Sequence, residues 1–391
     1  MIEAVAPPNR GLTFCDLSPF YAPTGGGIRT YHDAKLDWFA SQRRHRYFLL
    51  VPGPRFAITP RGPNATVVTF YGAPVRAGYR VPLDFAALRR VVDRLRPDVI
   101  ETGDPLISGP LGLLFRRLGY TGFLSSFYHS DPVATYIAPK PGTTGLVAAM
   151  QRRLGGWADR PLLRLQQRYD LTLTSSAWVE DMLQARGVSQ MARVPFGVDP
   201  IFFDVGRDRA PRRPRARLLY VGRLQADKGI DLLIDAIPDL LRIPNATLTV
   251  VGDGPAAPQL RALESPGLRL DGYVSSRAAL ARIYAEHDIL LAPGPYETFG
   301  LAVLEGLAAG LSLVAPDAGG AAELLRSLPT PHIFARDSRT DFVRAVRAAT
   351  EADGHTESRA AIALAAYYGT WSQAIAREVD TYCRYLSHCT T

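Results

Sequence analysis

The chain has 391 residues, 47% of them hydrophobic, and a formal net charge of +8, which predicts about two to three globular domains. No stretch approaches the roughly 18 consecutive apolar residues of a membrane span, and the first residues lack a secretory signal pattern, so we expect a cytoplasmic protein. Three cysteines, Cys15, Cys383 and Cys389, have spacings that fit neither a zinc site nor a disulfide framework and are interpreted as structural thiols.

The positive charge is concentrated in the first half of the chain. Residues 1–203 contain 24 Lys and Arg against 15 Asp and Glu, hence +9, whereas residues 204–391 contain 21 against 22, hence −1. This asymmetry predicts an anionic partner for the first half. We favour an anionic membrane surface over nucleic acid, because recognised nucleic-acid motifs are absent. The alternative is an arginine-rich composition without a partner, since all but three of the 45 basic residues are Arg.

A glycine-rich loop follows the first expected strand, residues 12–17. It contains Gly25, Gly26 and Gly27 and leads into an amphipathic helix that runs to Phe39. The order strand, glycine loop, helix places backbone N–H groups at a helix N-terminus, where they can bind a phosphate. A flexible turn without a ligand is the alternative.

Strands and helices alternate through the rest of the first half. Further strands are expected at residues 47–51, 66–71, 99–102, 122–127 and 171–175, and helices at residues 83–95, 111–118, 146–169 and 178–185. This alternation predicts an α/β, doubly wound domain with a parallel sheet covered on both faces. The helix at residues 146–169 carries arginines among leucine and tryptophan, a composition that suits either a lipid surface or a solvated face.

Polar residues follow the strand expected to end at Phe127. Tyr128, His129 and Asp131 stand at its carboxyl end, where α/β sheets bind their ligands. A histidine there can donate to a sugar hydroxyl or transfer a proton near neutral pH. Asp131 is expected to orient His129 or to meet an acceptor, and Tyr128 is assigned to the same acceptor side. A structural role for the histidine is the alternative.

A second domain begins after a polar stretch rich in Arg and Pro. Residues 204–217 are predicted to be a linker between domains at residues 1–203 and 218–370. The strand at 218–221 is followed by a loop that contains Gly222, Arg223 and Lys228. Because the two cations lie five residues apart beyond a strand end, we expect them to clamp a diphosphate.

The next strand, residues 248–251, leads into Gly252-Asp253-Gly254-Pro255-Ala256-Ala257. This run fits the loose dinucleotide-binding pattern, and Asp271 lies nineteen residues past Gly252. A dinucleotide-dependent oxidoreductase is therefore an alternative. Pro255 within the loop weighs against it, as does the position of the pattern on the second strand of its domain.

Residues 293–310 are the most informative stretch. A buried strand at 289–292 ends in a turn that carries Glu297, and a helix is expected from Gly300 to Gly310, with Glu305 at the margin of its buried stripe. A carboxylate there requires a polar partner. The N–H groups of the first helical turn, flanked by two carboxylates, suit a ligand with phosphate and hydroxyl groups, such as a nucleotide sugar.

Glu297 is the first residue of the run Glu-Thr-Phe-Gly-Leu, and Glu305 follows it with seven residues between them. Gly310 and a strand at 312–315 come next. This run resembles the signature of the family-4 retaining glycosyltransferases. The resemblance implies the GT-B fold, in which two Rossmann-like domains face each other across a cleft. It also implies transfer of a sugar from a UDP- or GDP-linked donor to a hydroxyl of a lipid or glycan acceptor, with anomeric configuration retained. An epimerase or isomerase of the same fold is a further alternative.

The resemblance implies roles for particular residues. Arg223 and Lys228 would bind the donor phosphates, Glu305 the ribose hydroxyls and Glu297 the donor sugar, while His129 would lie near the reacting centre. The other implied donor-binding residues are Gly25, Gly26, Gly27, Gly222, Gly252, Tyr273, Val274, Thr298, Phe299, Gly300 and Leu301. Since the sequence has no Asp-x-Asp pair, neither a metal nor another cofactor is expected.

Two further segments show the resemblance. The run Pro195-Phe196-Gly197-Val198-Asp199 is similar to the family's Pro-Asn-Gly-Val-Asp turn, with Phe196 in place of Asn. Helices are expected at residues 341–349, 359–367 and 371–386. The resemblance implies that the last segment, residues 371–391, returns to the first domain; a solubilising tail is the alternative. Donor base, sugar, acceptor and oligomeric state are left open.

Overall fold

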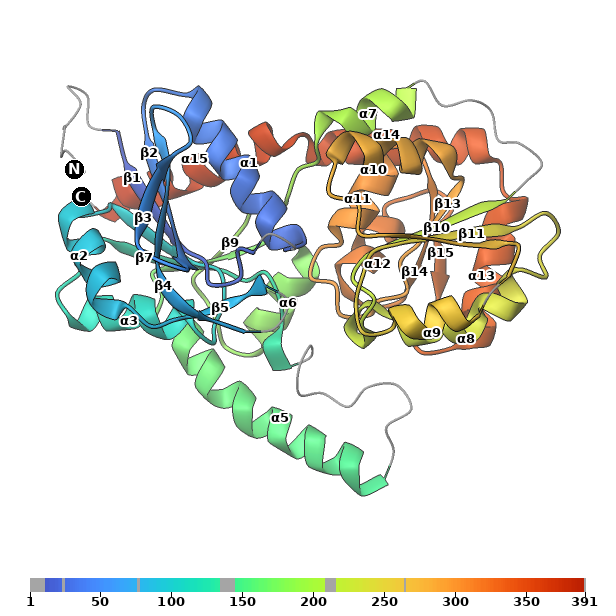
Figure 1. Ribbon diagram of the computed structural model, residues 1–391, viewed down its shortest axis with the longest axis horizontal. Helices are drawn as coiled ribbons and strands as arrows, with labels where there is room; N and C mark the ends of the chain where they lie inside the picture. The colour runs from blue at the N-terminus through green and yellow to red at the C-terminus, as the bar shows by residue number, and fades with distance from the viewer. Residues whose placement is uncertain are drawn as a thin grey trace.

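The computed structural model describes residues 11–22, 25–75, 78–133, 145–207, 216–263 and 265–389. They form two α/β domains that lie side by side (Figure 1). Each domain is built on a sheet whose central strands are parallel, with helices on both faces. The doubly wound architecture predicted from the sequence is therefore confirmed.

The N-terminal sheet has the strand order β3-β4-β2-β1-β6-β7-β8-β9, with β5 paired to β4. Its strands are β1 (Thr13–Leu17), β2 (Arg46–Gly53), β3 (Ala57–Pro60), β4 (Ala65–Pro74), β5 (Arg80–Pro82), β6 (Val99–Thr102), β7 (Phe123–Phe127), β8 (Leu171–Thr174) and β9 (Met191–Arg193). Only β3 and β5 run antiparallel to their partner. All residues of β1, β6, β7 and β8 are buried, as expected for strands covered on both faces.

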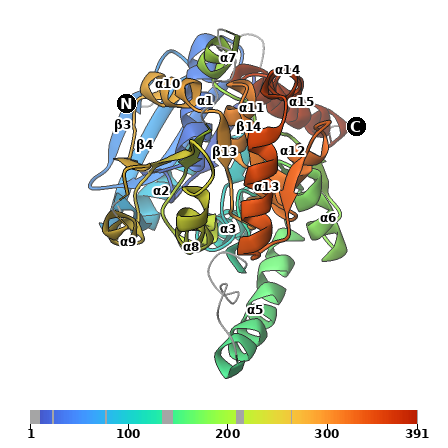
Figure 2. The same cartoon turned by 90° about the vertical axis from the view of Figure 1, so that its right-hand side faces the viewer.

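The helices of the first half are α1 (Gly27–Ser41), α2 (Phe85–Leu95), α3 (Ser108–Arg117), α5 (Gly145–Gln166), α6 (Ala177–Ala185) and α7 (Pro200–Arg207). Asp84 caps α2 by accepting from the Ala87 amide, and Ser176 caps α6 by accepting from the Val179 amide. Most of these helices cover the sheet. In contrast, α5 extends away from the body of the domain (Figures 1 and 2).

The C-terminal sheet has the order β12-β11-β10-β13-β14-β15. Its strands are β10 (Arg217–Val221), β11 (Thr247–Val251), β12 (Leu268–Gly272), β13 (Ile289–Leu291), β14 (Ser312–Pro316) and β15 (His332–Phe334). The helices are α8 (Ile230–Leu240), α9 (Ala257–Ala262), α10 (Arg277–Glu286), α11 (Leu301–Ala308), α12 (Gly319–Arg326), α13 (Arg339–Glu351) and α14 (Gly354–Tyr368), with a 3-10 turn at Ala226–Lys228. The strand order reverses between β10 and β13, where open α/β sheets bind ligands.

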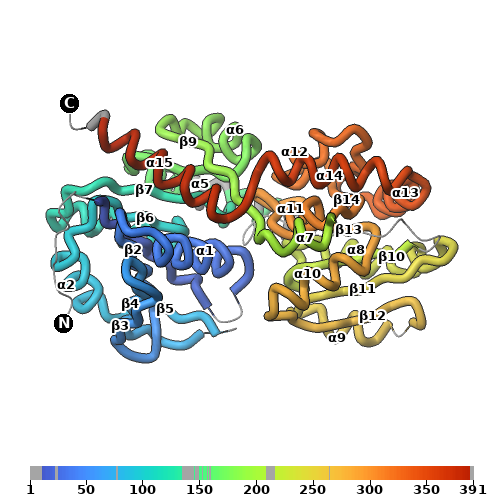
Figure 3. Tube along the Cα trace, turned by 90° about the horizontal axis from the view of Figure 1, so that it is seen from above, coloured from blue at the N-terminus to red at the C-terminus, as the bar shows by residue number. Residues whose placement is uncertain are grey.

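The last helix, α15 (Trp371–Cys389), runs from the C-terminal domain back across the N-terminal domain (Figure 3). It packs against α1. There the buried Lys35 ammonium lies 2.7 Å from the Glu378 carboxylate of α15, 2.8 Å from that of Asp16 and 3.2 Å from that of Glu101. A buried charge network therefore attaches the end of the chain to the first domain.

The predicted linker at 204–217 is partly wrong. Its first four residues complete α7, and Arg217 already belongs to β10, whereas residues 208–215 lie outside the described part. Tertiary contact explains the helix, because the fully buried Phe202 ring packs edge-on against Tyr284 with ring centroids 5.2 Å apart. In the part of the chain that the structure describes, no helix is long and apolar enough to cross a bilayer.

Candidate active site

The two domains meet where two helices begin. Gly27 starts α1, and a Cβ atom at this position would lie 2.8 Å from Leu301 Cδ1 at the start of α11. Neither helix has a side-chain cap or an acidic residue in its first turn. The N–H groups of both first turns therefore carry partial positive charge toward the boundary between the domains.

The glycines around these helix starts differ in environment. Gly25 is buried and its amide donates to the Ala22 carbonyl at 2.8 Å, whereas Gly26 and Gly27 are exposed. Gly300 precedes α11 with φ of 90°, a left-handed conformation that favours glycine. The loop before α1 thus leaves the backbone of Gly26 and Gly27 accessible for a close approach, whereas Gly300 before α11 is buried.

Lys228 and Glu297 form an ion pair beside these helix starts. The distance between Lys228 Nζ and Glu297 Oε1 is 2.6 Å, and about a quarter of each side chain is exposed. Gly229 holds the two segments together, because a Cβ atom there would lie 2.4 Å from the Pro293 carbonyl oxygen. The structure thus brings one predicted phosphate ligand into contact with the predicted sugar ligand.

Arg223 lies on the same loop but its guanidinium binds that loop. Its Nη1 donates to Gln225 at 2.9 Å and its Nη2 donates to Asp227 at 2.9 Å. The side chain is 41% exposed. Contact with a diphosphate would therefore require Arg223 to exchange these partners, just as Lys228 would have to exchange Glu297.

Gly222 and Gly252 bring two loops at strand ends together. A Cβ atom on Gly252 would lie 1.9 Å from the Gly222 carbonyl oxygen, and Gly252 has φ of 141°. The Gly222 amide donates to the Val251 carbonyl at 3.0 Å. The glycine pattern that suggested a dinucleotide fold thus serves the packing of these two loops.

His129 lies in an aromatic enclosure. Its ring stacks on Phe127 and Phe196 with centroid distances of 4.6 and 5.8 Å, and the Tyr31 ring meets it edge-on at 4.9 Å. Burial, followed by the nearby charges of His32 and Lys35, lowers the pKa of His129 to about 3. The imidazole is therefore neutral at physiological pH, and no described residue hydrogen-bonds to its Nε2.

A pair of hydrogen bonds connects His129 to the C-terminal domain. The Thr298 hydroxyl donates to the His129 carbonyl at 2.7 Å, and the Ser176 hydroxyl donates to the Thr298 carbonyl at 2.6 Å. Thr298 directly follows Glu297 in the sequence. His129, Thr298 and the ion pair of Glu297 are thus brought together from two domains, although they are far apart in the chain.

Phe196, which replaces the family's Asn, has an identifiable role in packing. Besides stacking on His129, its ring packs edge-on against Phe299 with centroids 5.3 Å apart. Phe299 is 2% exposed. The substitution therefore builds an aromatic bridge between the histidine of one domain and the start of α11 in the other, a contact that sequence reasoning missed.

Glu305 is buried, and the polar partners that its position requires are Arg277 and Tyr284. Arg277 Nη2 donates to its carboxylate at 2.8 Å, and the Tyr284 hydroxyl donates at 3.2 Å. The Arg277 guanidinium also lies 3.6 Å from Asp199 Oδ2 and over the Phe202 ring. Nothing in the sequence linked Arg277 to Glu305, since 28 residues separate them.

The other predicted donor residues line the same side of the C-terminal domain. Tyr273, after β12, is 50% exposed, and Val274 is half-buried. Tyr273 thus has an accessible ring for stacking. Leu301 is half-buried against Gly27, as described above.

The packing of Asp131 and Tyr128 gives no support to the predicted acceptor-side role. The Asp131 carboxylate is 2% exposed and accepts from Arg186 at 3.3 Å and from the Val133 amide at 2.9 Å. Tyr128 is 5% exposed and belongs to a hydrophobic cluster with Val179 and Leu183. Both side chains therefore pack in the interior of the N-terminal domain. The Asp131 carboxylate and the Tyr128 ring contact other residues of this domain instead of facing the cleft.

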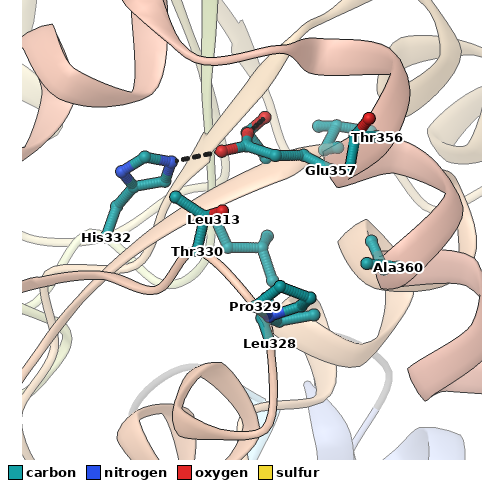
Figure 4. Close-up of a pocket in the computed structure, with 11 residues that line it drawn as sticks. Leu313, Leu328, Pro329, Thr330, His332, Thr356, Glu357 and Ala360 are labelled. Atoms are coloured by element: carbon teal, nitrogen blue, oxygen red, sulfur yellow. Dashed lines mark hydrogen bonds and ion pairs between the residues drawn. The ribbon is translucent and has the colours of Figure 1, made fainter.

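Two other features bear on the chemistry. Among the described residues, no group of three His, Cys, Asp or Glu side chains is arranged to hold a metal ion. A small pocket contains His332 and Glu357, joined at 2.7 Å (Figure 4). It lies at the amino ends of β14 and β15, whereas the signature turn follows the carboxyl end of β13, so this pocket is not part of the site.

Comparison with known proteins agrees with this geometry. The family described as "Glycosyltransferase Family 4" matches residues 25–202, and that described as "Glycosyl transferases group 1" matches residues 215–351. A "GDP-mannose-dependent alpha-(1-6)-phosphatidylinositol dimannoside mannosyltransferase" of Mycobacterium tuberculosis is 32% identical over 323 residues, which cover 78% of this chain and 80% of the relative. The chain belongs to glycosyltransferase family 4. This glycosyltransferase is also 31% identical over 262 residues to a "GDP-mannose-dependent alpha-mannosyltransferase" of the same species, covering 64% of this chain and 63% of that one.

Solved structures show that the glycosyltransferase has the GT-B fold. A sucrose-phosphate synthase from Thermosynechococcus elongatus superimposes with a TM-score of 0.73 at 18% identity, covering 96% of this chain and 100% of the other. HepE from Anabaena, in complex with UDP and glucose, superimposes with a TM-score of 0.67 at 18% identity, covering 95% of this chain and 99% of the other. The enzyme is a hexosyltransferase, and nothing in these findings favours an epimerase or an oxidoreductase.

Proposed function

We propose that this glycosyltransferase transfers mannose from GDP-mannose to a hydroxyl of a lipid-linked glycan, with retention of anomeric configuration. Support for the donor and the acceptor class comes from the mycobacterial relative, whose name specifies GDP-mannose and a phosphatidylinositol dimannoside. Support for the use of UDP sugars is weaker, because the structures that contain UDP share the fold at only 18% identity or less.

The observation that carries the proposal is the convergence of charges at the boundary between the domains. Lys228 and Glu297 are 2.6 Å apart, and Thr298 joins the same turn to His129. As the glycosidic bond lengthens, negative charge grows on the departing diphosphate. The Lys228 ammonium and the N–H groups at the starts of α1 and α11 would stabilise that charge; one preorganised donor of this kind typically contributes about 2.7–4 kcal/mol.

The ion pair implies an exchange of partners when the donor binds. The diphosphate competes with Glu297 for Lys228, because both are anionic. Once released, the Glu297 carboxylate accepts hydrogen bonds from hydroxyls of the donor sugar. Neutral His129 binds a sugar hydroxyl through its unpartnered Nε2, which is buried and has to become exposed when the donor binds. Glu305 accepts from the ribose hydroxyls.

The same geometry supports a displacement on one face of the sugar. No side chain at the site stands out as a covalent nucleophile. The acceptor hydroxyl therefore attacks from the side on which the diphosphate leaves, and a phosphate oxygen takes its proton. The positive charge at the site comes from the protein, so the reaction is proposed to need no metal or other cofactor.

The acceptor and the basic first half together suggest where the enzyme works. We infer a cytoplasmic protein that associates peripherally with the inner face of the plasma membrane. A lipid-linked acceptor would be held at that surface, and the charge of +9 on residues 1–203 would favour anionic lipid.

A panel of GDP- and UDP-linked sugars tests this function. GDP-mannose should support transfer to a lipid-linked mannoside in detergent micelles, with and without EDTA, and NMR of the product should show the donor's anomeric configuration. Inversion of configuration or loss of activity with EDTA would refute the proposed mechanism. Isomerisation of the donor without an acceptor would refute transfer as the main reaction.

A further inference from the structure

Helix α5 presents an exposed apolar stripe that the glycosyltransferase site does not use. Met150, Leu154 and Trp157 are 56%, 49% and 76% exposed. At roughly 100° per residue, Leu154 lies about 40° to one side of Met150 and Trp157 about 20° to the other, so the three share one narrow face. Figures 1 and 2 show that this helix projects beyond the domain body.

Arginines line one edge of this stripe. Arg153, Arg160 and Arg164 are exposed and lie about 40–80° to one side of Met150 on the same helical projection. None of the three forms an ion pair with a carboxylate in the described part of the chain. An apolar strip with a cationic border is the pattern of a helix that lies in a bilayer interface.

The far end of α5 is fixed to the domain that holds His129. Gln166 is 2% exposed, its amide donates to the Ser126 hydroxyl at 3.4 Å, and it accepts from the Thr172 hydroxyl at 3.3 Å. Ser126 belongs to β7, the strand that ends two residues before His129. A surface held by α5 would therefore be connected directly to this part of the site.

We propose that the stripe of Met150, Leu154 and Trp157, with its arginine border, docks the enzyme on an anionic lipid bilayer. The chemistry is complementary, because the tryptophan and aliphatic side chains enter the interface while the guanidinium groups contact lipid phosphates. A second copy of the chain fits less well, since three side chains are far fewer than the roughly 20–30 residues per partner of a stable protein interface. The inference rests on the lipid-linked acceptor proposed above, for which docking supplies access.

Vesicle flotation with the full-length enzyme tests the docking. Wild-type protein should float with phosphatidylcholine vesicles that contain phosphatidylglycerol, and not with phosphatidylcholine alone. Replacing Arg153, Arg160 and Arg164 by Gln should weaken binding by about a hundredfold, because each basic residue near the surface contributes roughly fivefold. Replacing Arg282, Arg347 and Arg359, which are exposed on the C-terminal domain, removes the same charge and should leave binding unchanged.

The apolar part of the stripe has its own variant and readout. Trp157→Ser should weaken binding to anionic vesicles at least tenfold and abolish the blue shift of tryptophan fluorescence that they cause in the wild type. A thermal unfolding curve matching the wild type would establish that the variant is folded. Should the wild-type protein itself stay unbound, or both α5 variants bind as the wild type does, the docking assignment is overturned.

Two measurements separate this inference from the proposed reaction. Transfer to a lipid-linked mannoside in detergent micelles needs no bilayer, so the α5 variants should retain wild-type turnover there and lose it on vesicles. Absence of transfer in micelles would refute the reaction and leave docking standing on flotation alone. Light scattering coupled to size exclusion gives the oligomeric state; a dimer that the Trp157→Ser substitution dissociates would refute docking in favour of self-association.

Discussion

Among the described residues, the Lys228 ammonium pairs with the Glu297 carboxylate, which the proposed diphosphate would replace. We expect Lys228→Ala to weaken GDP binding about tenfold to a hundredfold, because a charge-assisted contact contributes roughly 1.5–3 kcal/mol. Isothermal titration calorimetry with GDP measures the change. Arg347→Ala, on the exposed side of α13, is the control for a lost cation. Unchanged affinity of the Lys228 variant would remove Lys228 from the phosphate site.

Glu297→Gln should have the opposite effect on nucleotide binding. The substitution removes the anion that competes for Lys228, so the affinity for GDP is expected to stay the same or rise a few-fold. Turnover should fall, because the amide is a weaker acceptor for sugar hydroxyls than the carboxylate. Calorimetry measures the change in GDP affinity, and steady-state rates measure the change in turnover. A loss of GDP affinity would show that Glu297 holds Lys228 in place instead of competing for it.

His129 is expected to act as a neutral group. Its pKa is lowered from about 6.5 to about 3, so it should contribute no inflection to the pH dependence of kcat between about pH 5 and 8. His129→Ala should lower kcat about tenfold or more while GDP affinity stays near the wild-type value, and His355→Ala, an exposed histidine, should change neither. An inflection near pH 6.5 that the His129 variant lacks would refute the neutral role.

The lowered pKa of His129 also predicts how the free energy of unfolding depends on pH. Because His129 binds its proton more weakly in the folded state than in the unfolded state, its contribution to the free energy of unfolding is complete above about pH 6.5. It is lost progressively as the pH falls from there toward about 3. Mild acid should therefore destabilise the enzyme through this residue.

At the scale of elements, one helix is capped by the other domain. The amides of Ala177 and Trp178, at the start of α6, donate to the Glu323 carboxylate of α12 at 3.1 and 2.8 Å. Together with the hydrogen bond from Ser176 to Thr298, this contact holds the two domains in the arrangement that places His129 beside the signature turn. A carboxylate at a helix start also stabilises the helix dipole.

Glu323→Ala should loosen this interdomain contact. We expect the free energy of unfolding to fall by about 1 kcal/mol, the typical cost of a lost helix cap, and kcat to fall with it because the site is shared between domains. Thermal denaturation and X-ray scattering report stability and domain separation. Glu351→Ala, exposed at the end of α13, is the matched control. Wild-type kcat and scattering in the Glu323 variant would show that the contact does not set the domain arrangement.

Across the whole molecule, the buried network at Lys35 joins the last helix to the first domain. Burial disfavours the charged form of each group in this network and by itself raises the pKa of Asp16. The nearby charges of Lys35 and His32 nevertheless lower the pKa of Asp16 to about 2. Burial, reinforced by Glu101 and Asp16, raises the pKa of Glu378 well above its usual range. Glu378 therefore binds its proton more tightly in the folded enzyme than in the unfolded chain. Its contribution to stability declines as the pH rises from its unfolded pKa through the raised one.

Lys35→Met should destabilise the enzyme by about 3–5 kcal/mol, because it leaves buried carboxylates without their cation. Urea denaturation at neutral pH measures this loss. Glu378→Gln should be milder, since the amide still accepts from Lys35 and carries no charge that burial disfavours, and it should reduce the loss of stability on raising the pH. A larger cost for Glu378→Gln than for Lys35→Met would contradict this assignment of charge.

Several properties of the enzyme follow from local sequence. Runs of buried apolar residues bounded by Gly and Pro predicted β1, β6, β7 and β13 almost to the residue, because strands covered on both faces need no alternation. The spacing of Glu297 and Glu305 within its motif predicted the family, which the relative and the fold confirm. Short segments such as β3, β5 and α7 were missed, since their conformation depends on contacts with distant partners.

The tertiary structure alone decided which residues meet. The sequence marked His129, Lys228 and Glu297 as polar residues at strand ends. Only the packing of two domains joins His129 to Thr298 and Phe196 to Phe299, and only the fold of the C-terminal domain brings Arg277 to Glu305. The tertiary structure also buries Asp131 and Tyr128 in the interior of the N-terminal domain. Periodicity and turn chemistry act over a few residues and can be read from the chain, whereas these contacts span tens to hundreds of residues and exist only in the folded enzyme.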